Sequence, residues 1–275
     1  MPSAASTHHV AIESAIAGEL PVRSAPPRHI RELLCRVDSV ALLALVGCVL
    51  AASVVIGLIS GAGPAAYLGE WTAATLVSGG QLLLTAALLG RIFLRRRGAW
   101  IKRASEQTRV PPYAMWAVMA SGFLFLAADE LFELHERTDL FIHSAMALRE
   151  TPLSDRIDDG IVVVYALLGL MIMRRGRSEL ALFRAAWPAL RLAFFFLFAM
   201  VVFDLLTNRW FVPRGIDPDS QTIKTLAGWG TVAEESLKLL GGAMFIIAFA
   251  AVWRAASAMG TPTPSDPAHR GQSGL

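Results

Sequence analysis

Six apolar stretches, each close to the length of a membrane span, dominate this chain of 275 residues. A hydrocarbon core roughly 30 Å thick is crossed by about 20 residues of helix, and backbone groups in lipid find no water to bond. The sequence therefore predicts an all-α membrane protein, a bundle of six transmembrane helices. The expected spans are residues 40–60, 71–91, 112–133, 159–173, 188–207 and 233–253.

The composition leaves little chain for a soluble domain, because 55% of the residues are hydrophobic and only 17% are charged. We expect residues 1–37 to form a cytoplasmic tail that ends in an amphipathic helix on the membrane surface. Residues 38–254 would form the transmembrane domain, and residues 255–275 a disordered cytoplasmic tail. The connection at residues 177–187 is expected to lie on the membrane surface, with Leu180, Leu182, Phe183 and Trp187 toward lipid.

Most of the 25 Lys and Arg residues fall before the first span, after the sixth, and on the connections between spans two and three and between spans four and five. The positive-inside rule then places both termini in the cytoplasm, which predicts a multi-pass protein of the bacterial inner membrane. The net charge of +3 reflects contact with anionic membrane lipid, so nucleic acid is not an expected partner.

Residues 123–143 continue the third apolar stretch and add acidic residues and histidines to it. On a continuous helix, Asp129, Glu133, Glu136 and His143 would fall within a stripe roughly 80° wide. A carboxylate inside a span costs about 2.5–3.5 kcal/mol, so several on one face indicate a polar or watery partner. The following segment, residues 137–156, is expected to form a short lid or surface helix.

More charged groups lie at the same predicted outer ends of spans three to six. They are Glu130, His135, Asp158, Asp159, Asp204, Glu234, Glu235 and Lys238. We expect the four ends to form a cup that opens toward the outer leaflet. Crowded carboxylates must be separated, protonated, paired with a cation or bound to a metal.

Carboxylates combined with histidine suit Zn²⁺, Mn²⁺ or Fe²⁺, and carboxylates alone suit Mg²⁺ or Ca²⁺. The expected metal ligands are Asp129, Glu133, Glu136, His143, Asp204 and Glu234. Catalytic or substrate-orienting roles are expected for Glu133, Glu136, Glu234, Glu235 and Lys238. A bound metal would generate hydroxide at neutral pH. The function predicted in this way is a metal-dependent hydrolase of a lipid, lipid-linked or membrane-peptide substrate.

Two other classes of function remain open. The same acids would bind protons or a cation in a coupled transporter, and the cup would be a docking surface in a non-catalytic partner protein. Simpler explanations also exist for single residues. Glu133, His135 and Glu136 would mark the point where a span reaches water, and Asp129 and Asp204 would pair helices. Glu234 and Glu235 would be first-turn charges on a helix dipole, with Lys238 as their ion-pair partner.

Two short motifs resemble known families. Asp129-Glu130 with His135-Glu136, followed by a Glu-Glu helix, resembles uncharacterised bacterial multi-pass membrane proteins. The stretch Glu234-Glu235-Ser-Leu-Lys238 resembles the Glu-Glu-x-x-Lys motif of bacterial intramembrane glutamate proteases and, less closely, the motif of CAAX-type proteases. That resemblance implies glutamate-assisted cleavage of a membrane peptide. Histidines from later helices complete the motif in both families, whereas His269 in the tail is the sole histidine after Lys238 here.

Overall fold

The computed structural model describes residues 39–69, 71–101, 111–146, 157–207 and 221–259, and every regular element within these ranges is a helix. The predicted all-α class is therefore confirmed for this part of the chain. The elements are α3 (Ser39–Ile59), α4 (Ala73–Ile101), α5 (Ala114–Phe132), α6 (Leu134–Met146), α7 (Ile157–Arg175), α8 (Arg177–Leu180), the 3-10 helix η2 (Ala181–Ala186), α9 (Trp187–Thr207) and α10 (Gln221–Ala258). The expected surface helix at residues 28–37 lies outside the described residues.

Five helical stretches of the described chain are long and apolar enough to cross a membrane, which identifies a multi-pass membrane protein. They are Ser39–Ile59, Ala73–Ile101, Ala114–Phe132, Arg177–Phe203 and Gln221–Ala258. The expected span at residues 159–173 corresponds to α7, which is not among the five. Its 19 residues include two aspartates near the start and two arginines at the end. Large apolar side chains such as Phe195, 62% exposed, cover the surface, as lipid-facing helices require.

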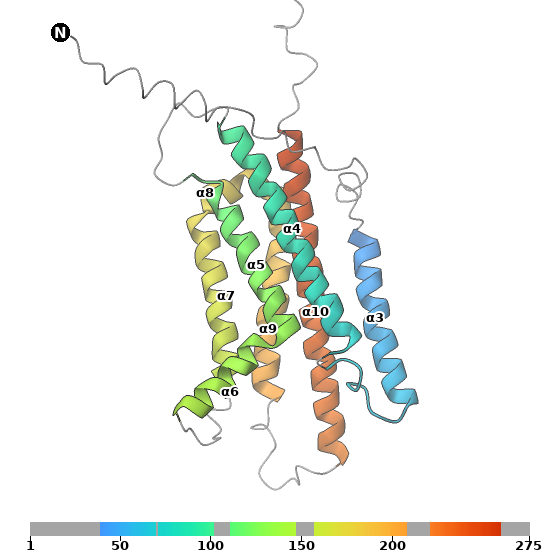
Figure 1. The fold of residues 1–275 in the computed structure, drawn as a ribbon. Helices are drawn as coiled ribbons and strands as arrows, with labels where there is room; N and C mark the ends of the chain where they lie inside the picture. Colours follow the sequence, from blue (N-terminus) through green and yellow to red (C-terminus); the bar gives the residue numbers. More distant parts are fainter. Residues whose placement is uncertain (1–38, 70, 102–110, 147–156, 208–220, 260–275) are drawn as a thin grey trace, which may run out of the picture. The chain divides into compact units, whose positions relative to one another are not determined.

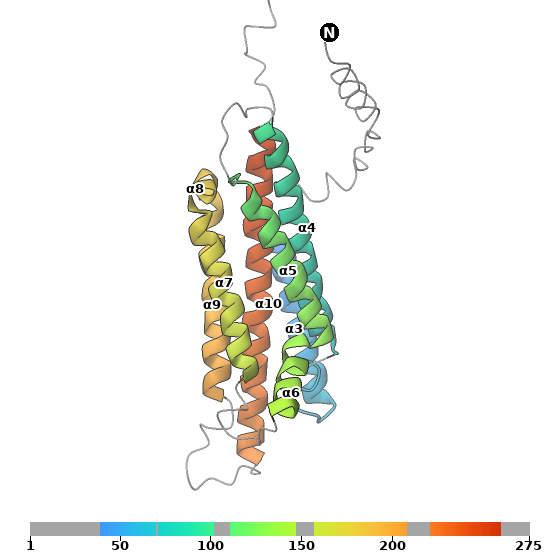
Figure 2. The ribbon, with the colours of Figure 1, turned by 60° about the vertical axis from the view of Figure 1, so that its left-hand side comes forward.

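The helix α10 is the centre of the bundle, because it packs along both α9 and α4, and α4 packs in turn along α5 (Figures 1 and 2). The core between these helices is aromatic. The ring of Phe123 on α5 lies 5.1 Å from that of Phe245 and 6.0 Å from that of Phe249, centroid to centroid. A Cβ on Gly241 would lie 3.2 Å from Leu197, so this glycine lets α9 approach α10 closely.

Two helices run further than expected. α4 continues to Ile101 instead of ending at residue 91, and α10 extends from Gln221 to Ala258 instead of from 233 to 253. Residues 255–258 therefore belong to a helix, and their predicted disorder is wrong. The reason is that hydropathy marks where a chain leaves the hydrocarbon, whereas a helix can continue beyond that boundary when a neighbouring helix supports it.

The connection between α7 and α9 does not lie on the membrane surface as a whole. Leu180 and Phe183 are buried at 2% and 3% exposure, and only Leu182 among the predicted lipid-facing apolar residues of α8 and η2 is strongly exposed. The expected lipid contact of Leu180 and Phe183 is therefore wrong. Phe183 is held inside because its ring packs edge-on against Trp116 of α5, 5.7 Å between centroids.

Candidate functional site

The boundary between α5 and α6 is a sharp break at Glu133. This residue has φ 53° and ψ 45°, a left-handed conformation that is uncommon for a residue with a side chain, and its N–H donates to the carbonyl of Asp129. α6 then leaves in a new direction (Figure 1). α5 thus ends within one residue of the predicted end of its span at residue 133, and Asp129, Glu133, Glu136 and His143 do not form the single stripe that a continuous helix would give.

Asp129 and His135 join the two sides of this break, and we call them the aspartate–histidine pair. Asp129 is buried, with 6% of its surface exposed. Its Oδ1 accepts the backbone N–H of His135 at 2.8 Å, and its Oδ2 lies 3.1 Å from the His135 ring Nδ1. The first N–H groups of a helix have no partner within the helix, so Asp129 supplies one for α6.

A second group of charged side chains connects α5 with α10, and we call it the lysine cluster. The Nζ of Lys238 lies 3.0 Å from Oε1 of Glu130 and 2.8 Å from Oε1 of Glu235. Glu235 is only 8% exposed, and its second oxygen, Oε2, is buried without a hydrogen-bond partner in the described part of the chain. One ammonium between two carboxylates leaves the cluster with a net negative charge when both are ionised.

The two groups start from neighbouring positions at the end of α5, because Asp129 and Glu130 are successive residues of this helix. A further polar side chain, Gln81 of α4, extends this region into the bundle. It is 5% exposed, and both its amide atoms lack a hydrogen-bond partner among the described residues. Gln81 packs against Gly242, one helical turn beyond Lys238 on α10, where a Cβ would collide with the amide. The bundle therefore contains a buried polar side chain one helical turn along α10 from the lysine cluster.

Among the other predicted site residues, Glu136 contacts the aspartate–histidine pair, and His143 contacts a residue of its own helix. The Oε1 of Glu136 lies 3.8 Å from Nε2 of His135, so Glu136 borders the aspartate–histidine pair. His143 instead contacts Asp139 on its own helix, with Nδ1 3.1 Å from Oδ1. Glu234 precedes Glu235 on α10. Asp204 belongs to the last turn of α9, and its side chain, like those of Asp158 and Asp159, lies outside the described residues.

The position of Glu234 and Glu235 excludes one of the simpler explanations. α10 begins at Gln221, so both glutamates lie about four turns inside the helix and not in its first turn. Stabilisation of a helix dipole fades within the first turn and does not explain them. The explanation of Lys238 as an ion-pair partner is correct for Glu235, but the other partner is Glu130 of a different helix.

The described residues give the expected metal centre no support, since no three His, Cys, Asp or Glu side chains among them are grouped to hold a metal ion. The metal-ligand set, which includes Asp204, stays a prediction. Conversely, the sequence places Glu130 and His135 in the predicted cup but assigns neither a ligand nor a catalytic role. Both belong to the quoted Asp-Glu and His-Glu motif, but they fall outside the stripe that a continuous helix would give.

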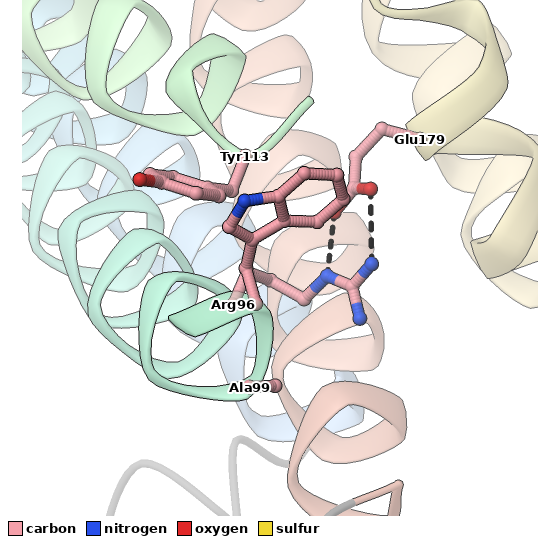
Figure 3. Close-up of a pocket in the computed structure, with 5 residues that line it drawn as sticks. Arg96, Ala99, Tyr113 and Glu179 are labelled. Carbon is pink, nitrogen blue, oxygen red and sulfur yellow. Dashed lines mark hydrogen bonds and ion pairs between the residues drawn. The ribbon is translucent and has the colours of Figure 1, made fainter. Parts of the chain in front are cut away.

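The opposite end of the bundle contains a buried charged group that the sequence did not reveal. Arg96 of α4 binds Glu179 of α8 through two hydrogen bonds, Nε to Oε1 at 2.5 Å and the terminal nitrogen to Oε2 at 2.9 Å (Figure 3). The indole N–H of Trp116 donates to the same carboxylate at 3.0 Å. We call these three residues the arginine–glutamate clamp, since they hold α4, α5 and α8 together beside a cavity of about 40 Å³.

The comparisons with known proteins assign no activity to this site. Neither the curated proteins nor the solved structures include a match to the chain. A family model does match residues 41–253, which include α4 to α9 and both the aspartate–histidine pair and the lysine cluster. Because this match covers well over half of the chain, the protein belongs to the family described as "Domain of unknown function (DUF8692)".

Proposed function

We propose that this protein is a membrane hydrolase that works by general acid–base catalysis at the break between α5 and α6. The observation that carries the proposal is the placement of two complementary groups on successive residues of α5. Asp129 holds an imidazole, and Glu130 holds the Lys238 ammonium. A base that activates water and a positive charge that stabilises the developing oxyanion can together catalyse hydrolysis of an ester, amide or phosphoester.

In the proposed reaction, Asp129 fixes the His135 tautomer with the proton on Nδ1, which leaves Nε2 as the base. Nε2 takes a proton from a water molecule while the water oxygen attacks the carbonyl carbon or phosphorus of the substrate. The Lys238 ammonium stabilises the negative charge that develops on the substrate oxygen. The imidazolium then returns its proton to the leaving group as the scissile bond breaks, which restores neutral His135.

The remaining acidic residues would assist this reaction. Glu130 and Glu235 hold Lys238 in place, since each has an oxygen within 3.0 Å of Nζ. Glu136 is close enough to His135 Nε2 to stabilise its protonated form. Glu133 and Glu234 would orient the substrate. A lipid, a lipid-linked molecule or a membrane peptide is the expected substrate class, because the site lies among apolar helices that face lipid.

We further propose that the protein lies in the bacterial inner membrane with six spans, α7 being the sixth, and with both termini in the cytoplasm. The support is the charge distribution. Arg95, Arg96 and Arg97 lie near the end of α4, and Arg174, Arg175 and Arg177 lie at the junction of α7 and α8, on the end opposite the acidic site. Reporter fusions at each terminus test this topology, and a periplasmic signal from either fusion would contradict it.

The reaction itself is tested with oxygen-18 water. The full-length protein in detergent is incubated with bacterial membrane extract, and mass spectrometry detects oxygen-18 in released carboxylates, phosphates or new peptide termini. We expect incorporation by the wild-type protein and a fall of about 10²–10⁴-fold in the His135→Gln variant. His143→Gln on α6 is the matched control, because His143 contacts Asp139 on its own helix. Equal incorporation with wild type and His135→Gln would refute the proposal.

One observation favours a proton- or cation-coupled transporter as the second candidate. The buried Oε2 of Glu235 and both amide atoms of Gln81 lack partners in the described residues, which suits a pathway for protons or water into the bundle. Proteoliposomes that contain a pH-sensitive dye test this candidate. Proton flux that Glu235→Gln abolishes, without hydrolysis in the oxygen-18 experiment, would favour transport over catalysis.

A further inference from the structure

The surface at the start of α9 carries positive charge that no acidic residue of the described ranges balances. Arg184 of η2 and Arg191 of α9 are both exposed, and no ion pair to either one is found in the described part of the chain. Glu179 is the sole acidic residue between Asp159 and Asp204, and Arg96 already binds both its oxygens. The two guanidinium groups are therefore available to an anion.

These arginines line a hollow of about 430 Å³ together with Trp187 and Pro188. Trp187, Pro188 and Arg191 follow Arg184 at three, four and seven positions. At these spacings, side chains share one face of a helix. The guanidinium of Arg191 lies 5.9 Å from the centre of the Trp187 ring, a cation–π contact that restrains both side chains. The hollow is shallow and open to the outside, as a site for a lipid headgroup at the membrane boundary would be.

The same helical face continues as an exposed apolar stripe along α9. Phe195, Phe198 and Val202 follow Arg191 at four, seven and eleven positions, and they are 62%, 44% and 53% exposed. All three belong to the membrane-length stretch that ends at Phe203, whereas the hollow lies toward its polar start. Tryptophan and arginine at the end of a span are typical of headgroup depth. A ligand that fills the hollow and continues along this face is therefore anionic at one end and apolar at the other.

We infer that Arg184, Trp187 and Arg191 bind the phosphate-containing headgroup of one anionic phospholipid, with an acyl chain along Phe195, Phe198 and Val202. Two guanidinium groups around one phosphate give charge-assisted hydrogen bonds, which are among the strongest available to a protein. This site is at the opposite end of the bundle from the aspartate–histidine pair, so the inference is independent of the proposed hydrolase.

Native mass spectrometry of the full-length, delipidated protein tests the inference with phosphatidylglycerol and phosphatidylcholine as probes. We expect the wild-type protein to bind one phosphatidylglycerol in preference to phosphatidylcholine. The double variant Arg184→Gln/Arg191→Gln should bind phosphatidylglycerol about 25-fold more weakly. The matched control is Arg174→Gln/Arg175→Gln, which removes the same charge from exposed residues at the same end of the bundle.

The outcomes of the lipid-binding experiment either support or overturn the phospholipid site. Equal losses in the two double variants would show that general surface charge binds the lipid, and would overturn the site. Competition by inorganic phosphate or glycerol phosphate at the concentration of the lipid would show a site for free phosphate instead of a lipid. A loss of lipid in Phe195→Ser/Phe198→Ser, with no loss in the matched double variant Leu76→Ser/Leu83→Ser on the exposed surface of α4, would confirm the acyl part of the inference. Unchanged binding in that variant would overturn it.

Discussion

The carboxylate of Asp129 contacts His135 twice across the break at Glu133, accepting the backbone N–H at 2.8 Å and lying 3.1 Å from the ring Nδ1. One side chain therefore both begins α6 and orients an imidazole. The first role needs only a hydrogen-bond acceptor, whereas the second needs a negative charge. Substitutions that keep the acceptor and remove the charge separate the two roles.

Asp129→Asn is the substitution that does so. The asparagine oxygen still accepts the His135 N–H, so we expect the free energy of unfolding to change by less than about 1 kcal/mol. Its amide group would favour the wrong imidazole tautomer, and oxygen-18 incorporation should fall about 10²–10⁴-fold. Thermal unfolding in detergent and the oxygen-18 experiment measure the two effects. Asp129→Ala removes the acceptor as well and should lose about 1 kcal/mol more stability. An Asn variant with full activity would contradict the orienting role.

Lys238→Met tests the lysine cluster as a source of stability. The substitution leaves Glu130 and the buried Glu235 without their shared cation, and breaking a buried ion pair costs about 3–5 kcal/mol. We therefore expect a clear loss in thermal stability, of which the double variant Lys238→Met/Glu235→Gln recovers part because the buried charge is gone. Arg137→Met, an exposed position on α6, serves as the control and should be nearly neutral. A double variant less stable than the single one would show that charge burial is not the cause.

Arg96→Gln should destabilise the other end of the bundle. It removes the guanidinium that binds both oxygens of Glu179, which is 4% exposed, so the expected cost is about 3 kcal/mol. Arg97→Gln on the exposed side of the same helix should change stability by less than about 0.5 kcal/mol. Unfolding midpoints in detergent compare the two directly. Similar values for both variants would mean that the arginine–glutamate clamp contributes nothing to stability.

Glu133→Gly tests the break itself. The left-handed conformation that Glu133 adopts costs a residue with a side chain about 1–2 kcal/mol of conformational free energy, and it costs glycine nothing. After allowance for the greater freedom of glycine in the unfolded chain, we expect stability to rise by up to about 1 kcal/mol. Glu133→Ala keeps the strained backbone and should show no such gain. If glycine destabilises the protein more than alanine does, the left-handed backbone at residue 133 is not a source of strain.

Chelation separates the acid–base reaction from the metal-dependent reaction that the sequence predicts. In the proposed mechanism the base and the positive charge are both protein groups, so hydrolysis should persist in EDTA. Elemental mass spectrometry of purified wild type, Asp129→Ala and Glu234→Ala complements this experiment. Stoichiometric metal in the wild type that both substitutions remove, together with loss of activity in EDTA, would establish the predicted metal centre and refute the acid–base proposal.

The local chemistry of the chain was sufficient to predict part of the site. Glu235 and Lys238 are conspicuous because charged residues inside an apolar stretch are costly and need partners. Asp129 stood out for the same reason. The partners themselves were not predictable, because Glu130 reaches Lys238 from a helix that is about a hundred residues away in sequence. The sequence places Glu179 in a connection expected on the membrane surface, and nothing near it in sequence indicates the contact with Arg96.

The sequence by itself determined that the chain is helical and crosses a membrane, because long apolar stretches can satisfy their backbone groups in lipid only as helices. It also determined that polar chemistry gathers near residues 129–136 and 234–238. The predicted span also ends at residue 133, but only the tertiary structure decided that α6 follows at once in a new direction, through one left-handed residue that apolar periodicity does not encode. That break replaces the expected stripe of four residues with two pairs, Asp129 with His135 and Glu130 with Lys238. The packing of α5 against its neighbours then sets which charges meet, since ion pairs depend on distance in space and not on position in the chain.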